Sequence, residues 1–250
     1  MAFDKSSGLA VSPGPRDGGG PTLMSLARGR FGPSLAGVHR LDPEASGVVL
    51  CAKTKPALDF LSGQFQSKTV RRTLHALAAL RPPGEADRAG DLRRDAAGAL
   101  PAEFSVDLAL GADEHQAGRV RVFRRRGGKP SLTEFRVLEP FGRFAWVECR
   151  PITGRMHQVR VHLASAGAPV LNDALYGEPG VVLLLSALKR GYKGREAEKP
   201  LITRLALHAG ALGFLHPGSR EAVEIASPVP GDLGIALKYL RRFAGRGAGS

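Results

Sequence analysis

Side chains capable of acid–base chemistry, ion pairing or metal binding gather in four short segments of this 250-residue chain. The segments hold five of the seven histidines together with acidic and arginine side chains, and they are residues 39–42, 154–163, 172–177 and 207–217. A zinc site needs ligands at defined spacings, and His157 and His162 are five apart, which is poor for one helix face. No HExxH or CxxC motif occurs. The spacing therefore predicts no metal and leaves carboxylates and arginines as candidates.

The charge balance points to a polyanionic partner. Lys plus Arg number 36 and Asp plus Glu number 23, which gives a formal net charge of +13 and a pI near 10.5. A basic surface suits RNA or DNA because each phosphate contact releases condensed counterions. A generally basic, solvated surface is the alternative. Three consecutive glycines at residues 18–20 are not followed by GK[ST], so they predict a flexible loop and no nucleotide cofactor.

Two features bear on the cellular compartment. Cys51 and Cys149 each lie in an apolar, strand-like stretch, which favours two buried free thiols in a reducing environment. The first ten residues lack the apolar core of a signal peptide, and the most apolar run, residues 181–188, is far too short to cross a bilayer. We therefore predict a cytoplasmic protein without a membrane partner.

The four segments carry motifs that recur together. HRLD at 39–42 is followed by Ser46-Gly47, GRxHQxRVHL spans 154–163, LYG spans 175–177 and LHAxxLxFxHP spans 207–217. In order and spacing these motifs resemble the RluA family of RNA pseudouridine synthases, from residue 4 to about residue 240. The resemblance implies isomerisation of uridine in RNA. That reaction needs neither an oxidant nor a donated group, so no cofactor is expected.

The resemblance also implies roles for individual residues. It assigns the catalytic carboxylate to Asp42 and a supporting charge to Arg160, because a nearby cation keeps a carboxylate ionised. It assigns Arg40 to the space that the uridine leaves when it is flipped out of the RNA. A structural alternative remains open for each arginine: a surface helix residue for Arg160 and a phosphate contact for Arg40. The implied substrate contacts are completed by His39, Leu74 and Val159, of which His39 could simply pack or bind backbone and Val159 fits a core position.

The sequence departs from the family pattern at several positions. Ala45 and Met156 stand where the family usually has threonine, and Leu74 stands where a K-x-Y pattern normally places an active-site tyrosine. Leucine can pack against a flipped base but supplies neither an aromatic ring nor a hydroxyl. The DKPSG-like segment, residues 4–8, begins at the very start, so either the N-terminal edge is shortened or the true start lies upstream. We expect no separate N-terminal RNA-binding domain.

The elements that must position these residues follow from hydrophobic periodicity and turn residues. We expect helices at 23–30, 54–67, 153–166 and 235–243, the third capped by Thr153 and stopped by Gly167. We expect loops at 12–21, 81–100 and 191–199. The expected strands are 47–52, 70–80, 104–110, 119–123, 132–138, 144–150, 205–214 and 222–225.

Closely spaced strands favour an antiparallel or mixed sheet. The resemblance makes this an α+β pseudouridine synthase fold, with a large, mostly antiparallel sheet in two lobes and Asp42 in a central cleft. Residues 1–243 would form the catalytic domain and 244–250 a flexible tail.

The sequence therefore predicts a stand-alone, monomeric synthase that modifies ribosomal or transfer RNA. The main alternative is a catalytically weak or inactive RNA-binding paralogue, suggested by Leu74, Ala45 and Met156. Retention of Asp42, Arg40 and Arg160 argues against that alternative, because a binding module needs no buried acid. A metal-dependent nuclease would require clustered carboxylates, which the sequence does not offer.

Overall fold

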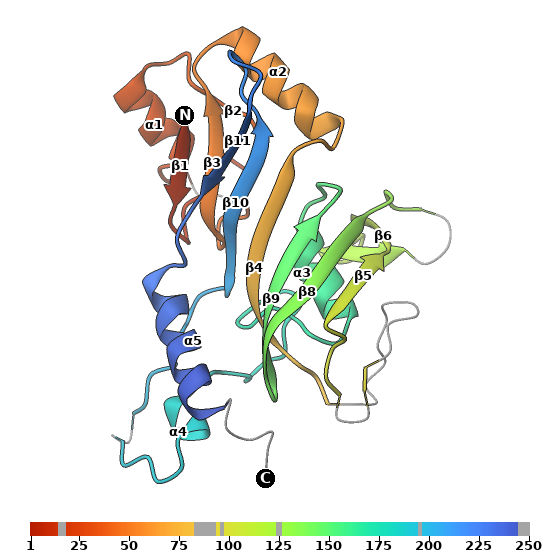
Figure 1. Ribbon diagram of the computed structural model, residues 1–250, viewed down its shortest axis with the longest axis vertical. Helices are drawn as coiled ribbons and strands as arrows, with labels where there is room; N and C mark the ends of the chain where they lie inside the picture. Colours follow the sequence, from red (N-terminus) through yellow and green to blue (C-terminus); the bar gives the residue numbers. More distant parts are fainter. Residues whose placement is uncertain (15–18, 83–93, 96–97, 124–126, 195–196, 245–250) are drawn as a thin grey trace. The chain divides into compact units, whose positions relative to one another are not determined.

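Strands outnumber helices in the computed structural model, which describes residues 1–14, 19–82, 94–95, 98–123, 127–194 and 197–244 (Figure 1). The fold is α+β with a large mixed sheet, as the sequence predicted. The chain divides into two units: residues 1–74 with 207–228, called the first unit, and residues 75–206 with 229–250, called the second unit. Strand β4 (Arg71–Ala79) begins in one unit and ends in the other.

The first unit is built around β3, whose seven residues are all buried. β1 runs antiparallel to β3 along one side, and β10 pairs with it in parallel. β2 and β11 add antiparallel pairs to β3 and β10 respectively. The elements of this unit besides β4 are β1 (Ala2–Lys5), α1 (Leu23–Phe31), β2 (Ala36–Gly37), β3 (Ser46–Ala52), α2 (Lys55–Gln66), β10 (Leu207–Leu215) and β11 (Ala222–Ala226).

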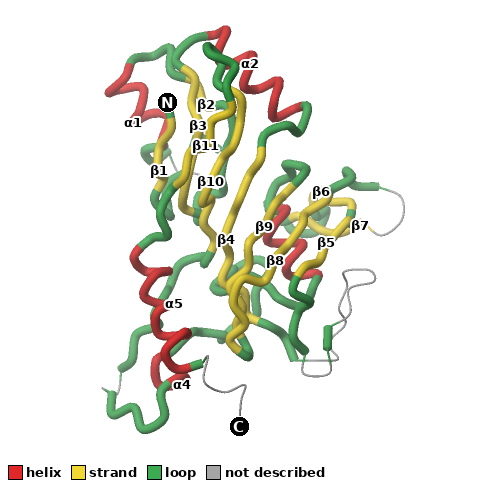
Figure 2. The backbone as a smooth tube through the Cα atoms, viewed as in Figure 1, coloured by secondary structure: helices red, strands yellow, loops and turns green. Residues whose placement is uncertain are grey.

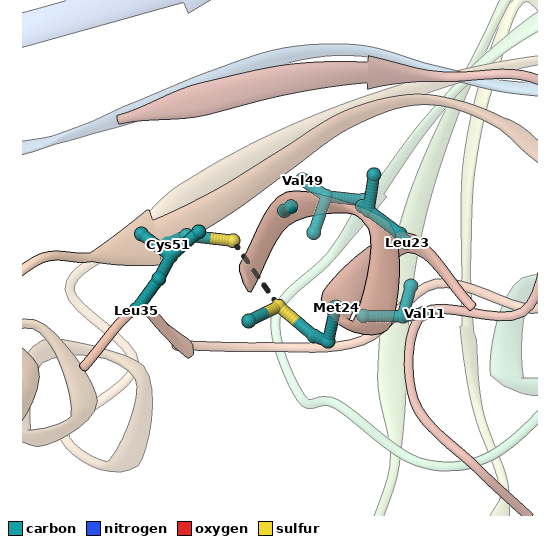
Figure 3. Packing of buried hydrophobic residues seen from close by; sticks show 7 residues of the cluster. Val11, Leu23, Met24, Leu35, Val49 and Cys51 are labelled. Carbon is teal, nitrogen blue, oxygen red and sulfur yellow. Dashed lines mark hydrogen bonds between the residues drawn. The ribbon is translucent and has the colours of Figure 1, made fainter. Parts of the chain in front are cut away.

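Local chemistry explains both helices of the first unit. Thr22 and Ser25 form a reciprocal capping box at the start of α1. The Thr54 hydroxyl accepts the Ala57 N–H at the start of α2, where Pro56 adds its fixed φ. Beneath α1 lies a cluster of buried apolar residues shown in Figure 3, namely Val11, Leu23, Met24, Leu35, Val49 and Cys51.

The second unit contains an antiparallel run in the order β9-β8-β5 and a separate β6-β7 pair. An irregularity between Val137 and Glu139 shifts the register of β8 against β9. Figure 2 distinguishes the strands from the helices of both units. The elements are β5 (Glu103–Asp107), β6 (Ala109–Ala112), β7 (Val120–Phe123), β8 (Leu132–Phe141), β9 (Phe144–Pro151), α3 (Gln158–Ser165), α4 (Leu185–Leu188) and α5 (Gly231–Phe243).

Two predicted elements were wrong. The helix expected from residue 153 begins at Gln158, after His157 in the left-handed conformation with φ of 53°. Gly167, with φ of 71°, stops that helix as predicted. The strand expected at 104–110 is divided at Leu108 into β5 and β6.

Other predicted segments are only partly described. Residues 15–18, 83–93, 96–97, 195–196 and 245–250 lie outside the described residues, so the loops at 12–21, 81–100 and 191–199 are tested in part and the tail hardly at all. At the N-terminal edge, where we expected a shortened structure, β1 pairs with β3 over four residues.

Candidate active site

Asp42 lies on a tight turn between β2 and β3. Its backbone carbonyl accepts a hydrogen bond from the Ala45 N–H at 3.1 Å, which closes a four-residue turn. Pro43 occupies the second position of that turn, where its fixed φ is favourable. The Asp42 side chain is half-buried. The carboxylate is therefore carried by a constrained turn at the entrance to a buried strand.

The buried side chain of Lys5 forms hydrogen bonds with this turn. Lys5 is only 1% exposed, although an ammonium is costly to bury. Its Nζ donates to the carbonyl oxygens of Ser6 at 2.9 Å, Pro43 at 2.9 Å and Ala45 at 2.6 Å. An ammonium has three donors, and these three bonds all go to backbone carbonyl oxygens. Lys5 thus ties β1 to Pro43 and Ala45 of the turn that carries Asp42.

The Ser-Gly after the turn lies against β10. His208 Nε2 donates to the Ser227 carbonyl at 3.2 Å, and His208 Nδ1 lies 3.0 Å from the Ser46 hydroxyl oxygen. Gly47 has φ of 118°, and a Cβ there would lie 2.2 Å from the Ala209 carbonyl oxygen. Only glycine fits this approach, which explains the Ser-Gly and His-Ala pairs of the motifs in structural terms.

The two motif residues before Leu41 behave differently. The Leu50 N–H donates to His39 Nε2 at 3.0 Å, and the imidazole stacks on Phe65 with ring centres 4.9 Å apart. Burial lowers the pKa of His39 to about 4, so the ring is neutral at physiological pH. Arg40 is exposed. The imidazole therefore braces the loop, while the guanidinium is available at the surface.

In the second unit, Arg160 on α3 forms a buried ion pair with Asp173. Nε donates to Oδ2 at 2.7 Å and Nη2 to Oδ1 at 2.8 Å, and the side chains are 3% and 0% exposed. Asp173 Oδ1 also accepts the N–H groups of Leu175 and Tyr176. The Arg160 guanidinium lies 5.3 Å from the Tyr176 ring centre. This two-bond geometry fixes the plane of the guanidinium.

Gln158 explains why α3 starts late. Its Oε1 accepts the Thr153 hydroxyl at 2.8 Å and the Arg155 N–H at 3.0 Å, while its Nε2 donates to the Thr133 hydroxyl at 2.9 Å. The Thr153 hydroxyl, expected to cap a helix, is taken up in this way and also accepts the Leu132 N–H. The side chain of Gln158 therefore joins the GRMHQ segment to β8.

The network continues to His162, which is fully buried. His162 Nε2 donates to the Leu108 carbonyl at 3.3 Å, so its Nδ1 accepts the Thr133 hydroxyl at 2.9 Å. Burial lowers the pKa of His162 to about 4. Both ring nitrogens are engaged with protein groups, and the Leu108 contact lies where β5 and β6 separate.

The Tyr176 hydroxyl contacts β7 and the residue that precedes α3. The Val120 N–H donates to its hydroxyl at 2.8 Å, and His157 Nδ1 lies 2.8 Å from the same oxygen. Burial raises the pKa of the phenol. A Cβ on Gly177 would lie 2.5 Å from the Asp173 carbonyl oxygen, which accounts for the glycine of LYG. The LYG motif is therefore a structural support for Arg160 and His157.

Comparison with known proteins decides the family. A family model described as RNA pseudouridylate synthase matches residues 1–165. The chain belongs to this family. Ribosomal large subunit pseudouridine synthase D of Neisseria meningitidis serogroup A is 36% identical over 251 residues, covering 98% of this chain and 60% of the relative. The enzyme of the same name from Xanthomonas campestris is 34% identical, with 99% and 69% covered.

Solved structures agree with the RNA pseudouridylate synthase family. Human RNA Pseudouridylate Synthase Domain Containing 1 aligns with a TM-score of 0.63 and 25% identity, covering 96% of this chain and 90% of that one. Human RNA Pseudouridylate Synthase Domain Containing 4 has a TM-score of 0.65 at 23% identity, with 96% and 89% covered, and supports the fold. The chain spans 60% of the length of the Neisseria relative, so it corresponds to a part of that protein.

The structure places the candidate site residues of this synthase family member in two groups. His39, Arg40 and Asp42 lie together on the first unit, and Leu74 is half-buried at the end of that unit's first segment. Arg160 and Val159 lie on α3 of the second unit, and both are buried. Their roles toward RNA stay predictions.

Three supporting residues escaped the sequence analysis, namely Lys5, Gln158 and Asp173. Each residue lies inside one of the motifs described above, so the motif is the sequence signal that points to it. The hydrogen-bond partners of these residues are distant in sequence, so their supporting roles could not be predicted. Among the described residues, no group of three or more His, Cys, Asp or Glu side chains is placed to hold a metal ion. No described helix combines the length and apolar character needed to span a membrane.

Proposed function

We propose that this chain isomerises uridine to pseudouridine in a structured ribosomal or transfer RNA, with Asp42 as the catalytic carboxylate. Membership of the RNA pseudouridylate synthase family supports the reaction class. The observation that carries the assignment to Asp42 is the turn on which it lies, closed by the Ala45 N–H and held by the buried Lys5 ammonium. A catalytic group held this firmly needs little reorganisation during the reaction.

The reaction is a balanced isomerisation. The bond from uracil N1 to ribose C1′ breaks, the base turns while bound, and a bond forms from C5 to C1′. The hydrogen on C5 leaves to water, and N1 takes up a proton, so no oxidant or co-reactant is consumed. Asp42 acts either by attacking C1′ or by removing a sugar proton, and both routes require an ionised carboxylate.

The target uridine must leave its stack to reach this carboxylate, at a cost of roughly a few kcal/mol. Arg40 is exposed two residues before Asp42, and its planar guanidinium is suited to stack in the vacated space and bind base edges. In this proposal Arg160 supplies the charge that keeps Asp42 ionised. Leu74, Val159 and His39 complete the walls around the base.

Several lines support an RNA substrate and a cytoplasmic site of action. The chain carries a formal net charge of +13, and its relatives are named for the large ribosomal subunit. We place the catalytic domain at residues 1–243 and expect it to act as a monomer, with no cofactor.

One observation favours the rival function of an inactive RNA-binding paralogue. Leu74 stands at the tyrosine position of the family pattern, so no phenol is offered there. The other two departures carry less weight. Ala45 serves the turn through its backbone N–H and carbonyl, which any residue supplies, and Met156 is 40% exposed on a loop outside α3.

Tritium release separates the two functions. Bulk RNA from cells lacking this protein, labelled at C5 of uracil, is incubated with the intact chain, with Asp42→Asn and with Glu44→Gln. We expect release from the intact chain and the Glu44 variant and none from Asp42→Asn, since Glu44 is an exposed carboxylate two residues away. Leu74→Tyr should raise the rate if leucine weakens base stacking.

No release from any of the four proteins, with RNA binding intact, would establish the paralogue and refute the synthase. Release from Asp42→Asn equal to that of the intact chain would refute the role of Asp42 while keeping the reaction class.

A further inference from the structure

A second basic surface lies on the second unit, on residues that the proposed catalytic machinery does not use. It consists of the exposed side of α5 and the segment that leaves α4, which packs against α5 (Figure 1). We call it the α4–α5 surface, and it comprises Lys189, Arg190, Lys193, Ile235, Lys238, Tyr239, Arg242 and Phe243.

The amphipathic pattern of α5 sets which residues face outward. Leu233, Leu237 and Leu240 are buried at helical spacing. Lys238 and Arg242, which lie four apart and share the opposite face, are both exposed. The helix therefore presents two cations on its exposed face, while the leucines on its opposite face are buried in the second unit.

Two ion pairs fix α5 in place. Arg204 binds Asp232 through Nε at 2.6 Å and Nη2 at 2.9 Å, at the start of the helix. Arg241 binds Glu139 of β8 through Nε at 2.8 Å. These pairs engage the carboxylates of Asp232 and Glu139. Within the described part of the chain, no salt bridge neutralises Lys238 or Arg242.

Aromatic rings lie among these cations. Tyr239 and Phe243 are half-buried and nearly parallel, with ring centres 6.2 Å apart and planes 8° from each other. The Arg242 guanidinium lies 5.3 Å from the Phe243 ring centre. Cations interleaved with flat rings are the combination that binds nucleic-acid backbone while offering a stacking platform to an unpaired base.

We propose that the α4–α5 surface binds the phosphate backbone of the RNA substrate and so adds affinity beyond the residues around Asp42. This inference rests on the proposed function for the choice of RNA. Its physical basis is that five cations, three on the segment after α4 and two on α5, are exposed, and that α4 packs against α5. RNA phosphates neutralise such cations at an entropic gain from counterion release.

Filter binding over a range of salt tests the surface directly. The double variant Lys238→Gln/Arg242→Gln is compared with the intact chain and with Lys55→Gln/Lys68→Gln, a control that removes the same charge from exposed positions in and just after α2. The probe is an in vitro transcript of large-subunit ribosomal RNA. We expect the slope of log K against log salt to become shallower by about 1.4 to 1.8 in the α5 variant, at roughly 0.7 to 0.9 per phosphate contact.

Single-turnover tritium release at saturating RNA should be the same for the α5 variant and the intact chain, because the surface contributes binding and not chemistry. Circular dichroism confirms that each variant is folded. The proposal would be overturned if the α5 variant had the same slope as the intact chain. It would also be overturned if the α2 control made the slope shallower by the same amount. A defect confined to binding of anionic phospholipid vesicles, with RNA binding unaffected, would overturn it as well.

The two proposals can fail separately. Absence of tritium release from the intact chain refutes the synthase, whereas the salt slope is measured on binding alone and tests the α4–α5 surface whether or not isomerisation occurs.

Discussion

Replacing Lys5 by methionine should damage both the stability of the first unit and the placement of Asp42. Methionine keeps most of the volume of lysine but removes the ammonium, so the carbonyl oxygens of Ser6, Pro43 and Ala45 lose the hydrogen bond from Lys5, while that of Pro43 keeps the bond from the Gly8 N–H. The bond to Ala45 is buried, whereas the other two are partly buried and can be hydrated. A buried acceptor left without a donor costs about 1–3 kcal/mol, and a partly hydrated one costs less. We therefore expect a loss of about 3 kcal/mol in the free energy of unfolding.

Catalysis should suffer more than RNA binding in the same variant. The Pro43 and Ala45 carbonyls belong to the turn that carries Asp42, and without Lys5 the turn can shift. A displacement of about 1 Å in a catalytic group costs on the order of 100-fold in rate. We expect kcat for tritium release to fall by that factor at saturating RNA, while the Kd for RNA stays nearly unchanged.

Urea unfolding and single-turnover release measure the two effects on the same samples. Lys55→Met is the matched control, because Lys55 is exposed in α2 and its surface ion pair with Asp59 is expected to contribute under about 1 kcal/mol. The reasoning is refuted if Lys5→Met is no less stable than Lys55→Met and releases tritium at the intact rate. Loss of stability with an undiminished kcat would confine Lys5 to folding.

Two further predictions concern the second unit. Asp173→Asn leaves the Arg160 guanidinium buried without its carboxylate, so we expect the free energy of unfolding to fall by about 3–5 kcal/mol in urea titrations, and a change below 1 kcal/mol would contradict the buried pair. The pKa of His162 is lowered to about 4 from 6.5, so its stabilising contribution is complete above pH 6.5 and is lost as the pH falls toward 4. Between pH 7 and pH 5 this amounts to about 2 kcal/mol, and His162→Gln should show a correspondingly weaker pH dependence, whereas equal slopes for both proteins would exclude the assignment.

Helices whose first residue is determined by neighbouring side chains were predictable from the sequence. A helix whose start depends on partners distant in sequence was not. The helix after Thr54 and Pro56 was found because its cap and its first-turn proline are adjacent to it. The helix expected from Thr153 was wrong because the cap hydroxyl is bound to Gln158, whose amide also bonds Thr133, 25 residues away. Local capping signals cannot reveal that competition.

The same distinction applies to the candidate site. The motif around Asp42 was visible in the sequence, as were His39 and Arg40 beside it. Lys5 was not recognised as a support, because its acceptors Pro43 and Ala45 are 38 and 40 residues away and a lysine next to a strand usually faces solvent. Composition and periodicity do not reveal that Lys5 bonds to the turn. The backbone geometry of the turn, which directs the Pro43 and Ala45 carbonyl oxygens toward Lys5, does.

The role of Arg160 differs most between the sequence prediction and the structure. The sequence assigned it one task, to keep Asp42 ionised. The structure shows that Asp173 already accepts two of its five N–H groups in a buried pair, which cancels much of its charge. An arginine paired in this way presents less net positive charge to a neighbouring carboxylate than an unpaired arginine does. Lys5 is different, because it lies in the same unit as Asp42 and its ammonium donates to the Pro43 and Ala45 carbonyl oxygens, which places a positive charge against the turn that carries Asp42.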